Sequence, residues 1–542
     1  MSTLLRSTRT MALGTVASRA TGFARTAVVA AVLGVGGVGT AFNVANTAPN
    51  IVYELLLGGV LSSVVVPLLV RAAKADDDGG EAYAQRLLSL TVLALGLASV
   101  LLVVLAPAIV DVYVSEDADE ATRDLAVLFA RFFLPQVLFY GAGAVMGAYL
   151  NTRGRFGPPM WAPVLNNVVV VVTGLVFLLL PGPSPLEPGT ITSTQTAVLG
   201  VGVTLGIVAQ TAALVPALRA TGFRFAPRLD LRGSGLGHAA RLAKWVVLLV
   251  VAQQAAYVVV VQLATGAGAA AEGRGYPSYV YAFVLWQLPH AVVAVSVITA
   301  LLPRMSRSAV DGRTGELRDA LDGGLRLVLV AMVPAAAAYA VLGPDLATLV
   351  FAHGEVSVEQ ARFLGVLLGV FAVGLVPFST YQLQMRAFYA MQDTRTPALV
   401  SIGVSATLVA VDLVLYALLP DDLRVAGLAA GQAASYVTGL VVLTALLRRR
   451  TGGGHGRVLQ TAARCVLAVL PAALLAGLAG ALLRGLAGDG PLAAVLVLAV
   501  GGLLLGGVYA AVLWRLRVPE LRSLLGPVAR RLDRGGGRRV RR

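Results

Sequence analysis

Residues 87–110 read LLSLTVLALGLASVLLVVLAPAIV, and this run contains no charged side chain. The run is longer than the roughly 20 apolar residues that an α-helix needs to cross the hydrocarbon core of a bilayer. It forms the centre of an apolar segment at residues 86–114, and similar segments recur along the whole chain. We therefore expect a transmembrane helix at this segment and treat the others as further candidate spans.

The composition excludes a water-soluble protein. Hydrophobic residues make up 57% and charged residues 13% of the 542 residues, and the mean hydropathy is +0.80. Soluble domains carry about 25% charged residues, so these side chains are too few to cover a water-facing surface of this size. The sequence therefore predicts an all-α polytopic membrane protein and excludes a soluble or disordered chain.

Fourteen apolar segments, separated by Pro, Gly and charged residues, predict about fourteen transmembrane helices. They lie at residues 11–35, 40–70, 86–114, 122–150, 158–181, 195–220, 240–265, 277–303, 322–343, 358–390, 396–419, 423–447, 460–484 and 491–514. The first segment does not read as a cleavable signal peptide, because Arg19 and Arg25 interrupt it and it leads directly into a second span.

The distribution of charge between the loops predicts the orientation. With the N-terminus in the cytoplasm, most arginines fall in cytoplasmic loops, whereas outer loops are acidic, as in the EDADE run at residues 116–120. This asymmetry explains the net charge of +15 better than nucleic-acid binding does. An even number of spans returns the C-terminus to the cytoplasm. We expect the basic tail, residues 530–542, to contact anionic lipid headgroups, with a protein partner as the alternative.

Several common kinds of site are not indicated. The one cysteine, Cys465, allows no intramolecular disulfide, and the four histidines are scattered without metal-ligand spacing. A G-x-G-x-x-G pattern at residues 34–39 follows a membrane helix rather than a strand, so we interpret it as a turn and not as a nucleotide site. The sequence shows no Walker A motif and no catalytic carboxylate pair. We expect no cofactor.

Two motifs recur at nearly one spacing. Pro67 and Pro303 end the second and eighth segments, 236 residues apart, while Pro158 and Pro397 follow the fourth and tenth, 239 residues apart. This predicts two parallel six-helix repeats around a central cavity, an arrangement found in transporters, plus a C-terminal helix pair. The predicted domains are residues 1–225 (spans 1–6), 226–450 (spans 7–12), 451–516 (spans 13 and 14) and 517–542 (tail).

Charged residues inside spans are the best candidates for function, because they are costly in a bilayer. Arg19 and Arg25 lie in the first span, roughly 9 Å apart along a helix axis. Arginine binds phosphate groups bidentately, so both side chains are candidates for contact with an anionic headgroup such as a pyrophosphate. The alternative is that Arg19 extends to the cytoplasmic interface.

Other polar residues inside spans leave alternatives open. Glu54 is the one carboxylate of the second span and is a candidate for pairing with Arg19 or Arg25, or for ion coupling. We favour structural ion pairs over gating roles for Arg131 and Asp412. Asn166 and Asn167 are the last candidates. We expect their side chains either to reach the cavity or to form hydrogen bonds with a neighbouring helix.

At these residues the chain resembles the MviN/MurJ family, the lipid II flippases of peptidoglycan synthesis. The resemblance is carried by six stretches in order along residues 18–397. They are SRATGFAR at residues 18–25, AFNVANTAPN at 41–50, GGVLSSVVVP at 58–67, NTRGRF at 151–156, LLPR at 301–304 and FYAMQDTRTP at 388–397. The family implies a fourteen-helix fold of the MOP exporter superfamily, with two six-helix lobes and a C-terminal pair that forms a lipid-facing groove.

The resemblance also implies a binding site. The family's two first-helix arginines correspond to Arg19 and Arg25, with Ser18 beside them, and these are implied to bind the lipid II pyrophosphate. We take Asn43, Asn46 and Glu54 of the second span as further substrate-binding candidates. The chain departs from many members at three places. These are Thr26 in place of an acidic residue, Tyr53–Glu54 where arginine is common, and residues 281–284 in place of an Asp-Arg pair.

The resulting expectation is a transporter, and not an enzyme, that flips lipid II from the inner to the outer leaflet by alternating access. A flippase for another polyprenyl-pyrophosphate-linked glycan and a cation-coupled drug antiporter remain as alternatives. The driving force is expected to be the membrane potential or a monovalent cation. The expected location is the bacterial inner membrane with both termini cytoplasmic. Cell-wall synthesis or division proteins are candidate partners of the basic tail.

Overall fold

The computed structural model describes residues 2–54, 66–75, 78–229, 236–453, 456–488 and 490–521. The described residues form α-helices joined by short loops, with no strand among them. Thirteen of these helical segments are long and apolar enough to cross a membrane. The predicted span at residues 40–70 is absent from the thirteen because residues 55–65 lie outside the described part. The count of fourteen therefore stays a prediction.

The chain divides into two compact units, each described separately. Unit 1 comprises Met1–Tyr281, His353–Ser357 and Pro420–Val425, and unit 2 comprises Ala282–Ala352, Val358–Leu419 and Ala426–Arg542. The predicted domain boundaries and the six-helix repeat remain predictions.

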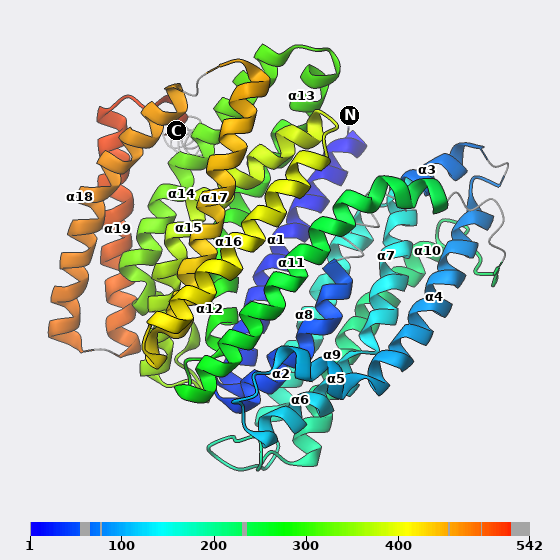
Figure 1. The fold of residues 1–542 in the computed structure, drawn as a ribbon, viewed down its shortest axis with the longest axis horizontal. Helices are drawn as coiled ribbons and strands as arrows, with labels where there is room; N and C mark the ends of the chain where they lie inside the picture. Colours follow the sequence, from blue (N-terminus) through cyan, green and yellow to red (C-terminus); the bar gives the residue numbers. More distant parts are fainter. Residues whose placement is uncertain are drawn as a thin grey trace, which may run out of the picture. The chain divides into compact units, whose positions relative to one another are not determined.

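Unit 1 holds α1 to α11, which are labelled in Figure 1. They are α1 (Ser2–Leu33), α2 (Gly37–Glu54), α3 (Val66–Ala75), α4 (Glu81–Val104), α5 (Ala106–Tyr113), α6 (Glu120–Phe133), α7 (Gln136–Thr152), α8 (Gly157–Leu178), α9 (Ser193–Ala212), α10 (Leu214–Arg219) and α11 (Leu236–Ala270). Helix α1 packs along α8, α8 along α9, α2 along α6, and α4 along α7. The 3-10 turn at Asp421–Leu423 also belongs to this unit.

Unit 2 holds the helices after residue 281. Helix α12 (Tyr276–Pro289) begins in unit 1, ends in unit 2 and continues through a π-helical turn, His290–Ala294. The remaining helices are α13 (Val295–Val310), α14 (Thr314–Phe351), α15 (Val358–Ala390), α16 (Arg395–Leu418), α17 (Arg424–Thr451), α18 (Gly456–Ala487) and α19 (Pro491–Arg515). Helix α14 packs against α15, α18 and α19, and the α18–α19 pair, orange and red, lies at one edge of the unit (Figure 1).

Several predicted spans are each built from two helices, which the hydropathy pattern does not reveal. The segment at residues 86–114 becomes α4 and α5, the segment at 122–150 becomes α6 and α7, and the segment at 195–220 becomes α9 and α10. Each second helix has a proline at its start or just before it: Pro107, Pro135 and Pro216. Proline lacks the backbone N–H that would continue the preceding helix, so a new first turn is its favoured place.

The loops predicted to be cytoplasmic are fixed by their charged residues. Before α4, the Asp78 carboxylate accepts hydrogen bonds from the backbone N–H groups of Ala82 (2.7 Å) and Gly80 (2.8 Å). These bonds, that of Ala82 first, hold the pKa of Asp78 below its ordinary value. Between α7 and α8, Arg153 donates to the Gly79 carbonyl at 2.9 Å and Arg155 donates to the Ala220 carbonyl at 3.4 Å.

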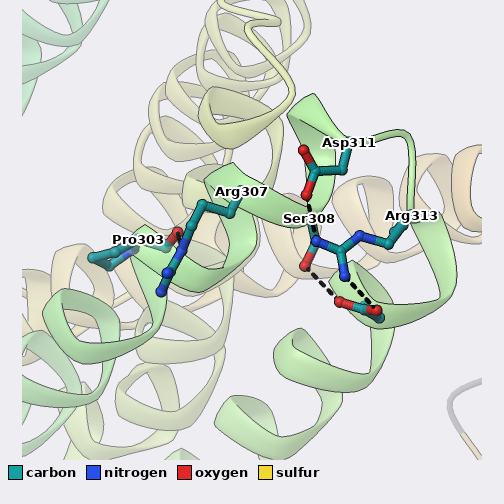
Figure 2. A network of polar contacts seen from close by, with 6 residues as sticks. Pro303, Arg307, Ser308, Asp311 and Arg313 are labelled. Atoms are coloured by element: carbon teal, nitrogen blue, oxygen red, sulfur yellow. Dashed lines mark hydrogen bonds and ion pairs between the residues drawn. The ribbon is translucent and has the colours of Figure 1, made fainter.

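The turn between α13 and α14 carries a similar network (Figure 2). Arg313 forms ion pairs with Asp311 and with Glu316, the latter at 2.8 Å, and Ser308 donates to Glu316 at 3.3 Å. The carboxylates of Asp311 and Glu316 raise the pKa of the Arg313 guanidinium. Arg307, in the last turn of α13, donates to the Pro303 carbonyl at 3.3 Å. Arg313 and Ser308 therefore tie the turn to the first residues of α14, whereas the Arg307 bond lies within α13.

Candidate functional site

Helix α1 carries three of the predicted site residues, Ser18, Arg19 and Arg25, and it is fixed in place by α8. The Asn167 amide of α8 donates to the Ser18 carbonyl at 3.2 Å and to the Thr21 hydroxyl at 3.0 Å. Asn167 therefore bonds to a neighbouring helix, which is one of its two predicted roles. Because a span has few polar groups, this contact sets the rotation of α1 and the direction of its arginines.

The two arginines of α1 differ in environment. Arg19 is exposed, whereas Arg25 is half-buried. Neither forms an ion pair with a carboxylate in the part of the chain that the structure describes. Arg25 instead lies within electrostatic range of Tyr140 on α7. A guanidinium inside a span without a carboxylate partner typically faces the protein interior or a water-filled cavity rather than lipid.

The residues around Arg25 form a polar and aromatic group. The Tyr140 hydroxyl donates to the Asn50 side-chain oxygen at 3.4 Å. The ring of Tyr53 packs on that of Tyr140, with centroids 4.6 Å apart and planes inclined by 45°. We call Arg25, Asn50, Tyr53 and Tyr140 the Arg25 cluster. It combines a cation, an amide and two aromatic rings from α1, α2 and α7.

Asn43 belongs to a different group of contacts. Its amide donates to the Gly39 carbonyl at 2.8 Å and to the Tyr281 hydroxyl at 3.3 Å. One turn further along α2, Thr47 shares a hydrogen bond of 2.8 Å with Tyr276, which shares another of 2.8 Å with Tyr257. We call this set the tyrosine network, and it joins α2 to α11 and α12 within unit 1.

The predicted site residues are therefore only partly brought together. On α2, Asn50 is bonded to Tyr140 of α7, whereas Asn43 and Thr47 are bonded to tyrosines of α12. Asn46 is half-buried on α2, between Asn43 and Thr47 of the tyrosine network in sequence. Glu54 ends α2, and its side chain lies outside the described part.

Sequence reasoning missed the two tyrosines of the Arg25 cluster. Tyr53 had a usable signal, because it lies three residues after Asn50 and so shares its face of α2. Tyr140 had no comparable signal. It meets Asn50 and Tyr53 through the packing of α7 against α2, which a single sequence does not specify.

Two predicted ion pairs are wrong within the described part of the chain. Arg131 is exposed on α6 and has no carboxylate partner among the described residues. Asp412 is fully buried on α16, and both of its carboxylate oxygens lack a hydrogen-bond partner there. The Asp412 carboxylate instead lies against the backbone of Gly431 on α17. The buried ion pairs of unit 2 involve other residues, Asp345 with Arg484 and Arg326 with Glu520.

The glycine-rich motif at residues 34–39 connects two helices. Gly34 ends α1 with a φ of 69°, a left-handed conformation that favours glycine. Because a helix precedes the motif, the context that a dinucleotide fingerprint requires is missing. The predicted interpretation as a turn is confirmed.

Comparisons with known proteins agree along most of the chain. The family model described as "Lipid II flippase MurJ" matches residues 29–490. A probable lipid II flippase MurJ of Rhizobium meliloti is 28% identical over 518 residues, which cover 94% of this chain and 92% of that protein. The lipid II flippase MurJ of Burkholderia cenocepacia is 29% identical over 405 residues, covering 74% and 76% respectively.

Solved structures show the same fold. A lipid II flippase MurJ in an inward closed conformation superposes with a TM-score of 0.73 at 17% identity, covering 94% of this chain and 99% of that one. An inward-facing multidrug resistance transporter of the MATE family, from the MOP superfamily, gives a TM-score of 0.65 at 16% identity, covering 81% and 98%. The fold predicted from the resemblance is therefore confirmed, although the number of spans and the repeat are not tested.

Proposed function

Because the chain belongs to the MurJ family of lipid II flippases, we propose that it moves lipid II from the inner to the outer leaflet by alternating access. Membership rests on a family match over residues 29–490 and on the helical membrane fold. The protein is thus a transporter and not an enzyme, it acts in peptidoglycan synthesis, and it is a multi-pass bacterial membrane protein.

The physical problem of this transport is the headgroup. Moving an unpaired pyrophosphate and its sugars through hydrocarbon is prohibitive, because every lost contact with water must be replaced. The single observation that supports our proposal is Arg25. It is a half-buried guanidinium inside a span, without a carboxylate partner in the described part of the chain. Its planar fork suits bidentate contact with a pyrophosphate oxygen pair.

The other predicted site residues take secondary roles in this proposal. Arg19 is exposed on α1 and would attract the anionic headgroup near the cytoplasmic end of the helix, with Ser18 beside it. Asn43 and Asn46 would contact the polar sugar or peptide groups. The Asn43 amide already donates to Gly39 and Tyr281, so binding the substrate would require it to exchange one of these hydrogen bonds for one to the ligand.

The energy source in this proposal is the membrane potential. An anionic headgroup moving outward in an inside-negative field gains roughly 2.3 kcal/mol per charge per 100 mV. Coupling to a monovalent cation through Glu54 is the second possibility. Glu54→Gln tests the second possibility, because undiminished flipping by this variant excludes coupling through that carboxylate.

We further propose that both termini are cytoplasmic, as the loop arginines indicate. Residues 522–542, which include the basic tail, lie outside the described part of the structure. Their charge suits anionic lipid headgroups, and cell-wall synthesis or division proteins are the second kind of partner to test.

The experiment is complementation. Bacteria depleted of their own lipid II flippase would express this protein, and lipid II exposed on the outer leaflet would be measured. We expect exposure to be restored, and Arg25→Ala to abolish it at equal protein level with a smaller loss for Arg19→Ala. Arg131→Ala is the matched control, because Arg131 is also an arginine inside a span of unit 1. Failure of the wild type despite correct insertion would favour another polyprenyl-pyrophosphate-linked glycan as substrate.

A further inference from the structure

The Arg25 cluster holds more than an anion site requires. Tyr140, with which Arg25 interacts electrostatically, packs its ring on that of Tyr53 with centroids 4.6 Å apart and is bonded through its hydroxyl to Asn50. Tyr140 is 8% exposed, but Tyr53 is only partly buried, so part of its surface remains open to a ligand. Neither ring contributes charge, so the presence of this aromatic pair needs a separate explanation.

The location of the cluster argues against contact with lipid. Arg25 and Asn50 lie in membrane-crossing helices, where charged and amide groups avoid hydrocarbon and face protein or water. Tyr140 interacts with Arg25 and is bonded to Asn50, so the ring that packs on it, Tyr53, shares this polar environment. An exposed aromatic surface in such a place is suited to an amphipathic ligand.

The chemistry of the cluster matches a sugar attached to a phosphate. A pyranose ring has C–H faces that pack on aromatic rings, and hydroxyls at its edge that bond to amides and phenols. The Asn50 side-chain oxygen accepts a hydrogen bond from the Tyr140 hydroxyl, and the Asn50 amide nitrogen keeps donors for a sugar hydroxyl. The adjacent guanidinium matches the anion that immediately precedes such a sugar in a glycosyl pyrophosphate.

We propose that Tyr53 and Tyr140 form a sugar-stacking subsite, which holds the first sugar of the headgroup while Arg25 holds its pyrophosphate. The inference rests on the proposed function, since it places a second part of the same lipid. It makes Tyr53 a specificity residue: the subsite distinguishes a lipid pyrophosphate that carries a sugar from one that does not.

The test compares two ligands with one tail and one anion. Purified full-length protein in nanodiscs is titrated with lipid II and with undecaprenyl pyrophosphate, which lacks the sugar. We expect Tyr53→Leu to weaken lipid II binding about fivefold and to leave undecaprenyl pyrophosphate binding unchanged. Tyr53→Phe, which keeps the ring, should bind lipid II like the wild type. Arg25→Ala should weaken both ligands.

A matched control exists in unit 2. Tyr389 is also half-buried and also lies beside an arginine, with Arg386 at 5.7 Å from the ring centroid, and Tyr389→Leu should leave both affinities unchanged. An unchanged lipid II affinity in Tyr53→Leu, with Arg25→Ala still weakened, overturns the subsite and keeps the proposed function. If Tyr53→Leu weakens the binding of both ligands equally, the subsite is also overturned, because this result would indicate a general distortion of the site. If neither ligand responds to Arg25→Ala or Tyr53→Leu, the subsite and the proposed role of Arg25 both fail.

Discussion

At the scale of single residues, the surroundings of a side chain decide its role more than its type does. Arg131 and Arg25 are both arginines inside spans, yet Arg131 is exposed whereas Arg25 is half-buried beside Tyr140. The sequence identified Arg25 because charge in a span is conspicuous. It did not identify Tyr140, because a tyrosine in a span is ordinary until a neighbouring helix places an arginine next to it.

Gly80 offers a residue-scale prediction about the turn before α4. Its φ is 81°, and an added Cβ would lie 2.7 Å from the backbone nitrogen of Ala73. Gly80→Ala therefore combines a left-handed backbone with a clash against main chain that cannot rotate away. We expect it to lower the free energy of unfolding by more than about 2 kcal/mol, measured by thermal unfolding of the purified protein.

Gly154 provides the control for this prediction. Its φ is 71°, but a Cβ there meets no atom within 4 Å. Gly154→Ala should therefore show only the backbone cost, about 1 kcal/mol. Equal unfolding temperatures for the two variants would show that the contact with Ala73 does not matter.

At the scale of helices, α14 holds the C-terminal pair through two buried ion pairs. Arg484 of α18 bonds to Asp345 at 2.6 Å, and Glu520, just after α19, bonds to Arg326 at 2.7 Å. The two α14 partners are roughly 28 Å apart along an ideal helix, close to the thickness of the hydrocarbon core. Tyr509 adds a bond of 3.1 Å to the Val330 carbonyl between them.

We predict that the two side chains of the Arg326–Glu520 ion pair contribute to stability in an energetically coupled way. Arg326→Ala alone should cost about 3 kcal/mol, because it leaves the buried Glu520 carboxylate without its partner. Glu520→Ala alone should cost less, because the Arg326 side chain is 24% exposed. The double variant should cost clearly less than the sum of the two. Thermal unfolding of the four proteins of this cycle measures the coupling. Additive losses would mean that the two side chains do not depend on each other in the folded protein.

The loop between α15 and α16 has a predictable pH dependence. Asp393 accepts from Thr396 at 2.7 Å and pairs with Arg450 at 3.0 Å. Burial of Asp393 acts to raise its pKa, but the bonds from Thr396 and the charge of Arg450 outweigh it, so its pKa lies below the ordinary value. A lowered pKa stabilises the folded state above the unfolded-state pKa of about 4, and this stability is lost as pH falls through the lowered value.

Asp393→Asn mimics the protonated state and tests this directly. The wild type should unfold at a higher temperature than the variant at pH 7, and the difference should shrink towards zero as the pH drops well below 4. A difference that stays constant across that range would show that ionisation of Asp393 does not support the loop.

Helix boundaries also mark the limit of sequence reasoning at this scale. Hydropathy located the helices, because long apolar runs have few alternatives in a bilayer. It did not show that α14 extends over Thr314–Phe351, since the predicted segment, 322–343, stops where polar residues begin. Those outer turns are held by contacts such as Ser308 with Glu316, which no hydropathy window registers.

At the scale of the whole molecule, the helical membrane fold and the family could be predicted from composition, apolar periodicity and six short motifs. The binding site could be predicted only in part, because the Arg25 cluster joins α1, α2 and α7 through packing that one sequence does not encode visibly. The proposed orientation rests on loop charges alone, and it can be tested without any transport assay.

Cysteine labelling supplies that test. The one native cysteine, Cys465, is buried, so background labelling should be low. With an impermeant maleimide on intact spheroplasts, we expect Glu116→Cys, at an exposed position in a predicted outer loop, to be labelled. Arg449→Cys, exposed at the end of α17, should be labelled only after the membrane is opened. The reverse pattern would invert the proposed topology.

The most direct test of the central claim is lipid II movement in a purified system. Vesicles containing the protein and fluorescent lipid II, with an imposed potential that favours movement of the anion, would be assayed for the rate at which lipid II reaches the opposite leaflet. We predict a rate well above that of protein-free vesicles and a return to that background with Arg25→Ala, while Arg131→Ala keeps the wild-type rate. A wild-type rate equal to that of protein-free vesicles, or an undiminished rate with Arg25→Ala, would contradict the account.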